Sequence, residues 1–222
     1  MEKRALILFL KYPEKGKVKT RLAKTLGDDF VLELYQHFII DILETCKKID
    51  SNIILAISFE NGCIQNTLFY EEYTCISQRG YNLGDKMYNA FFDIFSQGYS
   101  KLVLIGSDIP DLPAEIITDA FNKLDQDDIV LGPCKDGGYY LIGLNNEKND
   151  HSIFDGVPWS TPLVMERTID NLKSKGLSWN FLIPLNDIDN SNDLKCYYEN
   201  NRNRDVRSST MKFILQNTSI FL

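Results

Sequence analysis

Apolar residues recur along the chain in two patterns, which predict alternating strands and helices. Short continuous apolar runs are typical of strands buried on both faces of a parallel sheet. Apolar residues spaced every three or four positions indicate helices with one buried face. The runs predict strands over residues 4–11, 52–59, 73–77, 101–106, 128–132, 139–144 and 179–184. The helical spacing predicts helices over residues 28–46, 83–95, 161–175 and 193–199, and a further helix that opens at Pro113.

This alternation predicts an α/β fold, a three-layer α/β/α sandwich around a mostly parallel central sheet. No internal repeat, low-complexity block or linker interrupts the pattern, so residues 1–222 are expected to form a single domain. The polar and charged segment from about residue 200 is expected to be a mobile tail. In open α/β sheets, ligands bind beyond the carboxyl ends of the strands, so candidate functional residues are sought there.

The composition is that of an ordinary globular protein, and it narrows the possible classes of partner. The 222 residues include 24 Lys+Arg and 31 Asp+Glu, and the formal net charge is −7. This acidic balance argues against nucleic-acid binding, because phosphate backbones require clustered positive charge. No apolar run approaches the ~20 residues of a membrane span, so no membrane partner is expected.

The cysteines are expected to be free thiols. They are odd in number, widely spaced and without a C-x-x-C pair, which favours a reducing compartment and a cytoplasmic location. A zinc site is not expected, because neither histidine stands at ligand spacing from a cysteine. Most of the five are interpreted as small buried hydrophobic residues. They are Cys46, Cys63, Cys75, Cys134 and Cys196.

The loop after the first predicted strand concentrates positive charge. Five basic residues against one Glu give residues 11–21 a local charge of +5 − 1 = +4. A loop at this end of a strand can bind a polyphosphate through its cationic side chains and backbone N–H groups, and Gly16 would allow a close backbone approach. A solvated basic loop is the alternative. The basic residues are Lys11, Lys15, Lys17, Lys19 and Arg21.

Two aspartates near the carboxyl ends of strands are candidate ligands for Mg²⁺. Asp108 is the first carboxylate after the strand 101–106, and a strand holds such a ligand firmly against phosphate oxygens. Asp189 follows the last predicted strand in the sequence DIDNSNDL, and we expect it to bind the metal as well. Asn190 or Ser191 is expected to cap the helix that comes next.

Two neighbouring aspartates leave alternatives open. Asp111 is explained equally well by a helix cap or an Asx turn as by metal ligation. Asp187 is expected to lie at the same end of the sheet as Asp189. The sequence does not decide whether either one binds metal.

A glycine pair stands between the fifth and sixth predicted strands, in the sequence GPCKDGGYY. The pair can form an ordinary tight turn, or it can let a substrate lie against the backbone. In the second case Asp136, Gly137 and Gly138 would bind the acceptor, with Asp136 accepting a hydrogen bond from a hydroxyl group or holding a second cation.

Residues 78–87, QRGYNLGDKM, join the third predicted strand to a helix. Their polar groups and glycines suit contacts to a nucleotide base or ribose, whereas the start of a helix is the structural alternative. The expected nucleotide-binding residues here are Gln78, Gly80, Leu83 and Gly84.

Six segments in this order resemble a known family. They are KYPEKGKVKTRLA, QRGYNLGDKM, LIGSDIPDLP, GPCKDGGYYLIGL, WST and DIDNSNDL. Together they resemble the glycosyltransferase-like group described as "transferase 1, rSAM/selenodomain-associated". That group is similar to 2-phospho-L-lactate guanylyltransferase and, more distantly, to molybdenum-cofactor guanylyltransferase and the CMP-sugar synthetases. The resemblance extends over about residues 4–194.

The resemblance implies a fold of the nucleotide-diphospho-sugar transferase (GT-A) type. It also implies that Lys11, Lys19 and Arg21 grip the nucleotide phosphates, that Asp108 holds Mg²⁺ and that Asp189 supplies the second metal contact. The chain departs from the CMP-sugar synthetases after Asp189, where it has Asn-Ser-Asn in place of Thr-Pro-Glu. It also lacks the G-G-x-S-x-R-M-G loop of sugar nucleotidyltransferases.

The resulting expectation is a transferase that depends on Mg²⁺ or Mn²⁺ and acts on a nucleotide. Lys19, Arg21 and Asp108 are the expected catalytic residues, and Lys17 and Gly16 are expected to join them in binding the nucleotide. Nucleotidyl transfer from a nucleoside triphosphate to a small acceptor, for which a phosphorylated compound is one option, would release pyrophosphate. Glycosyl transfer from a nucleotide sugar and a non-catalytic nucleotide-binding role are the alternatives. The oligomeric state stays open.

Overall fold

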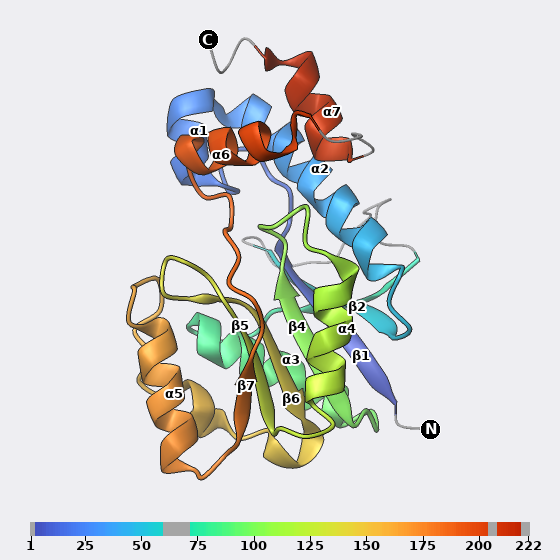
Figure 1. The fold of residues 1–222 in the computed structure, drawn as a ribbon, viewed down its shortest axis with the longest axis vertical. Coiled ribbons are helices and arrows are strands. Elements are labelled where there is room, and N and C mark those ends of the chain that lie inside the picture. Colours follow the sequence, from blue (N-terminus) through green and yellow to red (C-terminus); the bar gives the residue numbers. More distant parts are fainter. Residues whose placement is uncertain (1–2, 60–71, 204–207, 219–222) are drawn as a thin grey trace.

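A single seven-stranded sheet organises the computed structural model, which describes residues 3–59, 72–203 and 208–218 (Figure 1). The strand order is β3-β2-β1-β4-β6-β5-β7, and every neighbouring pair is parallel except the two that involve β6. The fold is therefore α/β with a mostly parallel mixed sheet, as the sequence predicts. The strands are β1 Arg4–Lys11, β2 Asn52–Ser58, β3 Thr74–Ser77, β4 Lys101–Gly106, β5 Ile129–Pro133, β6 Tyr139–Asn145 and β7 Trp179–Phe181.

Helices cover both faces of the sheet. Alternate side chains of β1 show this directly: Leu6 and Leu8 belong to one hydrophobic core, and Ala5 and Ile7 belong to the other. The first core contains α2 and α4, and the second contains α3 and α5. The helices are α1 Thr20–Leu26, α2 Asp28–Cys46, α3 Leu83–Phe95, α4 Ala114–Lys123, α5 Val164–Ser174, α6 Ser191–Asn201 and α7 Ser209–Gln216, with 3₁₀ turns at Asn146–Lys148 and His151–Phe154.

Three helices gather beyond the sheet rather than on its faces. In Figure 1, α1, α6 and α7 lie together at one end of the molecule, next to the upper part of α2. Asp41 of α2 fixes α7 there, because its carboxylate accepts hydrogen bonds from the backbone N–H groups of Ser209 and Thr210 at 2.7 and 2.8 Å. The described helices include none with the length and hydropathy of a membrane span.

The structure corrects several expected element boundaries. Helices α1 and α7 are not predicted by the sequence pattern. Helix α7 lies within the stretch expected to be a tail, of which residues 204–207 and 219–222 lie outside the described part. Pro113 is the N-cap of α4 rather than its first helical residue. The strand expected over residues 179–184 ends at Phe181, and the helix expected from residue 161 begins at Val164.

Candidate functional site

The carboxyl ends of β1, β4 and β5 form one edge of the sheet, and the candidate residues follow these ends. The segment after β7 reaches the same edge by running along β5, where the Leu185 N–H donates to the Pro133 carbonyl at 3.0 Å. It then crosses to the loop after β4, where the Ile188 N–H donates to the Asp108 carbonyl at 3.0 Å. This path brings Asp187 and Asp189 to the aspartate that follows β4.

Lys19 is the centre of the resulting charge cluster. Its Nζ lies 2.9 Å from Asp108 Oδ1 and 2.9 Å from Asp189 Oδ1, and only 7% of its side chain is exposed. Burial lowers the pKa of the ammonium group, but Coulombic attraction and hydrogen bonds from both carboxylates outweigh that effect and raise the pKa above its ordinary value. Lys19 is therefore a charged lysine held between two carboxylates.

Arg21 joins the cluster from the solvent side. Its Nη1 lies 3.6 Å from Asp189 Oδ2, and 71% of its side chain is exposed. The expected convergence of the basic loop with Asp108 and Asp189 is thus present, although their positions are up to 170 residues apart. The structure places Lys11 and Lys17 of the same loop on the surface.

Tyr35 is a buried residue next to the cluster that the sequence analysis did not identify. Its hydroxyl accepts a hydrogen bond from the Lys11 N–H at 3.0 Å and lies 3.0 Å from the hydroxyl of Ser107. Burial, with a smaller contribution from Asp108, raises the pKa of this phenol, which keeps it protonated. Tyr35 therefore ties the end of β1 to the end of β4. In the sequence it is only one more residue of the buried face of α2.

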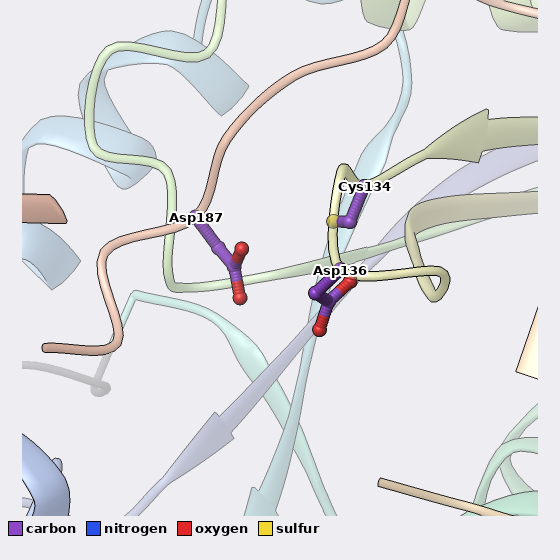
Figure 2. Close-up of side chains that lie close together, drawn as sticks. All are labelled: Cys134, Asp136 and Asp187. Carbon is purple, nitrogen blue, oxygen red and sulfur yellow. The ribbon is translucent and has the colours of Figure 1, made fainter. Parts of the chain in front are cut away.

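A second group of potential ligands lies beside the first. Figure 2 shows Cys134 and Asp136 on the loop after β5 and Asp187 on the facing segment, with the three side chains directed toward one another. One ligand atom from each lies within 4.8 Å of the others. Burial, followed by repulsion from Asp189 and Asp136, raises the pKa of Asp187 to about 6. The pKa of the Cys134 thiol is raised by burial and by the surrounding aspartates, so this cysteine is a protonated thiol rather than a nucleophile.

Asp108 and Asp189 are a pair of carboxylates directed at one point. Both present a carboxylate oxygen to the same point, which the ammonium group of Lys19 occupies. Carboxylate oxygens are the ligands that Mg²⁺ and Mn²⁺ prefer. Their chemistry therefore fits the metal implied by the resemblance, and the partly buried Asp187, which lines the same pocket as Asp189, is a further oxygen donor.

A pocket of about 700 Å³ adjoins the cluster and extends beneath α6. Its lining includes Arg21 and Lys135, the aromatic ring of Tyr197, and more carboxylates than cations. Asp111 is among these carboxylates, and Asn201 Nδ2 at the end of α6 lies 3.4 Å from its Oδ2. Since Pro113 caps α4, Asp111 is not the helix cap considered in the sequence analysis. The aspartates of the lining are Asp111, Asp136, Asp187, Asp189 and Asp193.

Residues of the segment expected to contact a base or ribose make structural contacts within the protein. The Gln78 side-chain amide donates to the backbone carbonyls of Leu10 and Ala56 at 3.1 and 2.9 Å, which links it to β1 and β2. A side chain at Gly84 would begin 2.7 Å from the ring of Trp159. These contacts favour the helix-start alternative for Gln78 and Gly84. A nucleotide contact by either of them, or by Gly80 and the partly exposed Leu83, stays a prediction.

The glycine pair also has a structural reason. Gly137 has a φ of +93°, and a Cβ there would lie 2.2 Å from the Pro162 carbonyl oxygen. Gly138 donates its N–H to Asp136 Oδ1 at 3.0 Å, which closes the turn. Asp136 lines the large pocket, as its neighbour Lys135 does, and acceptor binding by Asp136 or by the glycines stays a prediction. Gly16, in the basic loop, has a φ of +75°, and a Cβ there would make an ordinary contact with Asp28 Oδ2 at 3.7 Å.

Comparison with known proteins places the chain among transferase-like folds. Residues 39–161 match the family model described as an uncharacterized protein conserved in bacteria, DUF2064. A crystal structure of a proposed nucleotide-diphospho-sugar transferase from Desulfovibrio desulfuricans G20 superposes with a TM-score of 0.92 and 34% sequence identity, covering 99% of this chain and 97% of that one. No curated protein matches the chain.

More distant solved structures share the fold. 4-Diphosphocytidyl-2C-methyl-D-erythritol synthase from Anaerococcus prevotii DSM 20548 has a TM-score of 0.57 and 9% identity, over 89% of this chain and 99% of that one. CMP:2-keto-3-deoxy-manno-octonic acid synthetase, solved with CTP, has a TM-score of 0.53 and 8% identity, over 89% and 98%. The fold is accordingly that of the nucleotide-diphospho-sugar transferases, as the sequence predicts.

Proposed function

The chain belongs to the DUF2064 family of bacterial proteins, and from that premise we propose that it is a Mg²⁺-dependent transferase acting on a nucleotide. The reaction we favour is nucleotidyl transfer from a nucleoside triphosphate to a small acceptor. The observation that carries the proposal is the convergence of Lys19 and Arg21, from the basic loop, with Asp108 and Asp189 beside a pocket of about 700 Å³.

In this proposal the basic loop binds the triphosphate. Arg21, largely exposed at the pocket, can form charge-assisted hydrogen bonds to phosphate oxygens, and Lys19 lies next to it. Asp108 and Asp189 would hold Mg²⁺, which when bound neutralises phosphate charge and orients the phosphate groups. No covalent nucleophile is needed for such chemistry, and the two histidines lie outside this cluster, in α2 and in the 3₁₀ turn at 151–154.

The transfer step follows from these positions. An oxygen of the acceptor attacks the α-phosphorus, and the bond from that phosphorus to the bridging oxygen breaks. The bond electrons leave with pyrophosphate. A phosphorylated acceptor is already ionised, whereas a hydroxyl acceptor would give up a proton. Asp187, a partly buried carboxylate of the pocket whose pKa is raised to about 6, would accept that proton.

Glycosyl transfer is the second candidate, because the relative from Desulfovibrio desulfuricans is described as a proposed nucleotide-diphospho-sugar transferase. The excess of aspartates in the pocket also favours a hydroxyl-bearing partner over a phosphate, since carboxylates accept hydrogen bonds from hydroxyl groups and repel phosphates. In that reaction a nucleoside diphosphate would leave instead of pyrophosphate.

The leaving group distinguishes the candidates. Purified protein would be incubated with Mg²⁺, isotope-labelled nucleoside triphosphates or nucleotide sugars, and a panel of phosphorylated and hydroxylated acceptors. Pyrophosphate release that requires an acceptor supports nucleotidyl transfer, and nucleoside diphosphate release supports glycosyl transfer. Metal-dependent nucleotide binding without either product would contradict the proposed enzyme and favour a regulatory binding protein. Asp108→Asn serves as the matched inactive control.

A further inference from the structure

The position between Asp108 and Asp189 is held by a cation that belongs to the chain itself. Lys19 Nζ lies 2.9 Å from each carboxylate, and its side chain is almost fully buried. Two carboxylates that approach one point repel each other unless a cation lies between them. Lys19 therefore supplies in the free protein the charge that the proposed metal would supply in the complex.

The backbone at Lys19 is unusual as well. Its φ of 44° and ψ of 45° place it in the left-handed region, where residues with a side chain are rarely found. Lys19 is also the N-cap of α1, and no side-chain hydrogen bond caps that helix end. Strained conformations of this kind persist where the surrounding structure enforces them and are concentrated at ligand sites and switches. The strain lies in the very segment expected to bind phosphates.

We propose that Lys19 is an exchangeable counter-ion, which a metal–nucleotide complex displaces from Asp108 and Asp189 and which then pairs with the nucleotide phosphates. This inference rests on the proposed function, which assigns the metal to Asp108 and Asp189 and the nucleotide to the basic loop. A divalent cation and the ammonium group cannot occupy one position, so binding of the metal requires Lys19 to move. The phosphates that arrive with the metal provide the displaced ammonium with a new anionic partner.

The exchange predicts that the protein binds the metal ion more weakly alone than together with a nucleotide. A metal ion alone must separate the buried ammonium group of Lys19 from its two carboxylates and leave it without a partner, which is costly. A metal ion together with a nucleotide avoids that cost. Lys19 therefore adds to the coupling of the two binding events, each making the other tighter, and removing Lys19 removes this contribution.

The test measures Mn²⁺ binding without nucleotide, by electron paramagnetic resonance of the free ion. Lys19→Met is expected to bind Mn²⁺ at least about tenfold more tightly than the wild type, because the competing positive charge is absent. Lys15→Met is the matched control, since it removes the same charge from the same loop but from a lysine paired with Asp29. Its Mn²⁺ affinity should equal that of the wild type. Adding Asp189→Asn to Lys19→Met should cancel the gain.

A merely structural role for Lys19 would not raise metal affinity, so equal Mn²⁺ affinities of Lys19→Met and the wild type, or no measurable binding by either, would overturn the exchange. Should Lys19→Met not fold, Lys19→Gln, which keeps a hydrogen-bonding side chain, undergoes the same titration. Nucleotide titrations of the wild type are separate: a gain in Mn²⁺ affinity without any nucleotide binding would sustain the counter-ion and reject the proposed function.

Discussion

Among single residues, the two cations of the basic loop differ in how directly each can be tested. Lys19 is buried in an ion pair, so its removal alters the site before any ligand arrives. Arg21 is largely exposed and contacts the cluster through Asp189 at 3.6 Å. A change at Arg21 therefore reports on ligand contacts with little disturbance of the fold.

Arg21→Ala is expected to weaken nucleotide binding by about 1–3 kcal/mol, the range for a lost charge-assisted hydrogen bond. Isothermal titration with nucleoside triphosphates in the presence of Mg²⁺ measures the change. Lys24→Ala, on the exposed surface of the same helix, is the control and should bind as the wild type does. Equal affinities for Arg21→Ala and the wild type would contradict phosphate binding by Arg21 and favour a solvated basic loop.

Residue types in the sequence were sufficient to predict that the basic loop and the two aspartates meet, because the carboxyl ends of parallel strands share one edge. They were not sufficient to predict that Lys19 lies between the aspartates, since that depends on the left-handed backbone at residue 19. The proximity of Cys134 to Asp136 and Asp187 was also not predicted. Its position two residues before Asp136, directly after a strand, was the available signal.

At the scale of elements, the start of α6 positions Asp189. Asn190 caps this helix by accepting a hydrogen bond from the Asp193 N–H at 3.2 Å. Asp193 in return accepts hydrogen bonds from the N–H groups of Asn190 and Asp189, both at 3.0 Å. The sequence analysis expected Asn190 or Ser191 as the cap, and the structure has Asn190. The capping box fixes the backbone that carries the proposed metal ligand.

Asn190→Ala is expected to lower the free energy of unfolding by about 1 kcal/mol, the typical cost of a lost N-cap. Chemical denaturation followed by circular dichroism gives the value. Asn192→Ala removes an exposed asparagine two positions further along the same helix and should leave the stability nearly unchanged. An equal loss of free energy of unfolding in both variants would contradict a stabilising role of the Asn190 cap.

The elements that the sequence predicted are those with a clear apolar period. Helix α3 and strands β1 and β4 have the expected bounds. Helix α1 was missed because Leu22 is its only buried residue, which leaves no period to detect. Helix α7 was missed because it is short and because a carboxylate of α2, distant in sequence, pairs with its first N–H groups.

For the whole molecule, Asp187 links the site to stability. Its pKa rises from an ordinary 3.8 to about 6 in the folded state, chiefly through burial and then through Asp189 and Asp136. Between these two values the folded state binds more protons than the unfolded state, so stability falls as pH rises through this window. Above about pH 6 the ionised carboxylate lowers the free energy of unfolding. Destabilising groups of this kind are expected at functional sites.

Asp187→Asn should therefore be more stable than the wild type by about 1 kcal/mol at neutral pH, a figure kept small because the carboxylate is partly exposed. The advantage should vanish by about pH 4, where Asp187 is protonated in the folded protein. Urea unfolding across this range, with a chelator present, measures both. Asp170→Asn, on the surface of α5, is the control. A pH-independent difference would contradict the assigned pKa.

The central claim is that Asp108 and the basic loop form one metal–nucleotide site. Calorimetric titration of nucleoside triphosphates into the wild type and Asp108→Asn, each with and without Mg²⁺, tests it most directly. We expect the wild type to bind a nucleotide more tightly with Mg²⁺, and we expect Asp108→Asn to lose this metal-dependent gain while still unfolding cooperatively. The same Mg²⁺-dependent affinity in both proteins, or no nucleotide binding by the wild type, would contradict it.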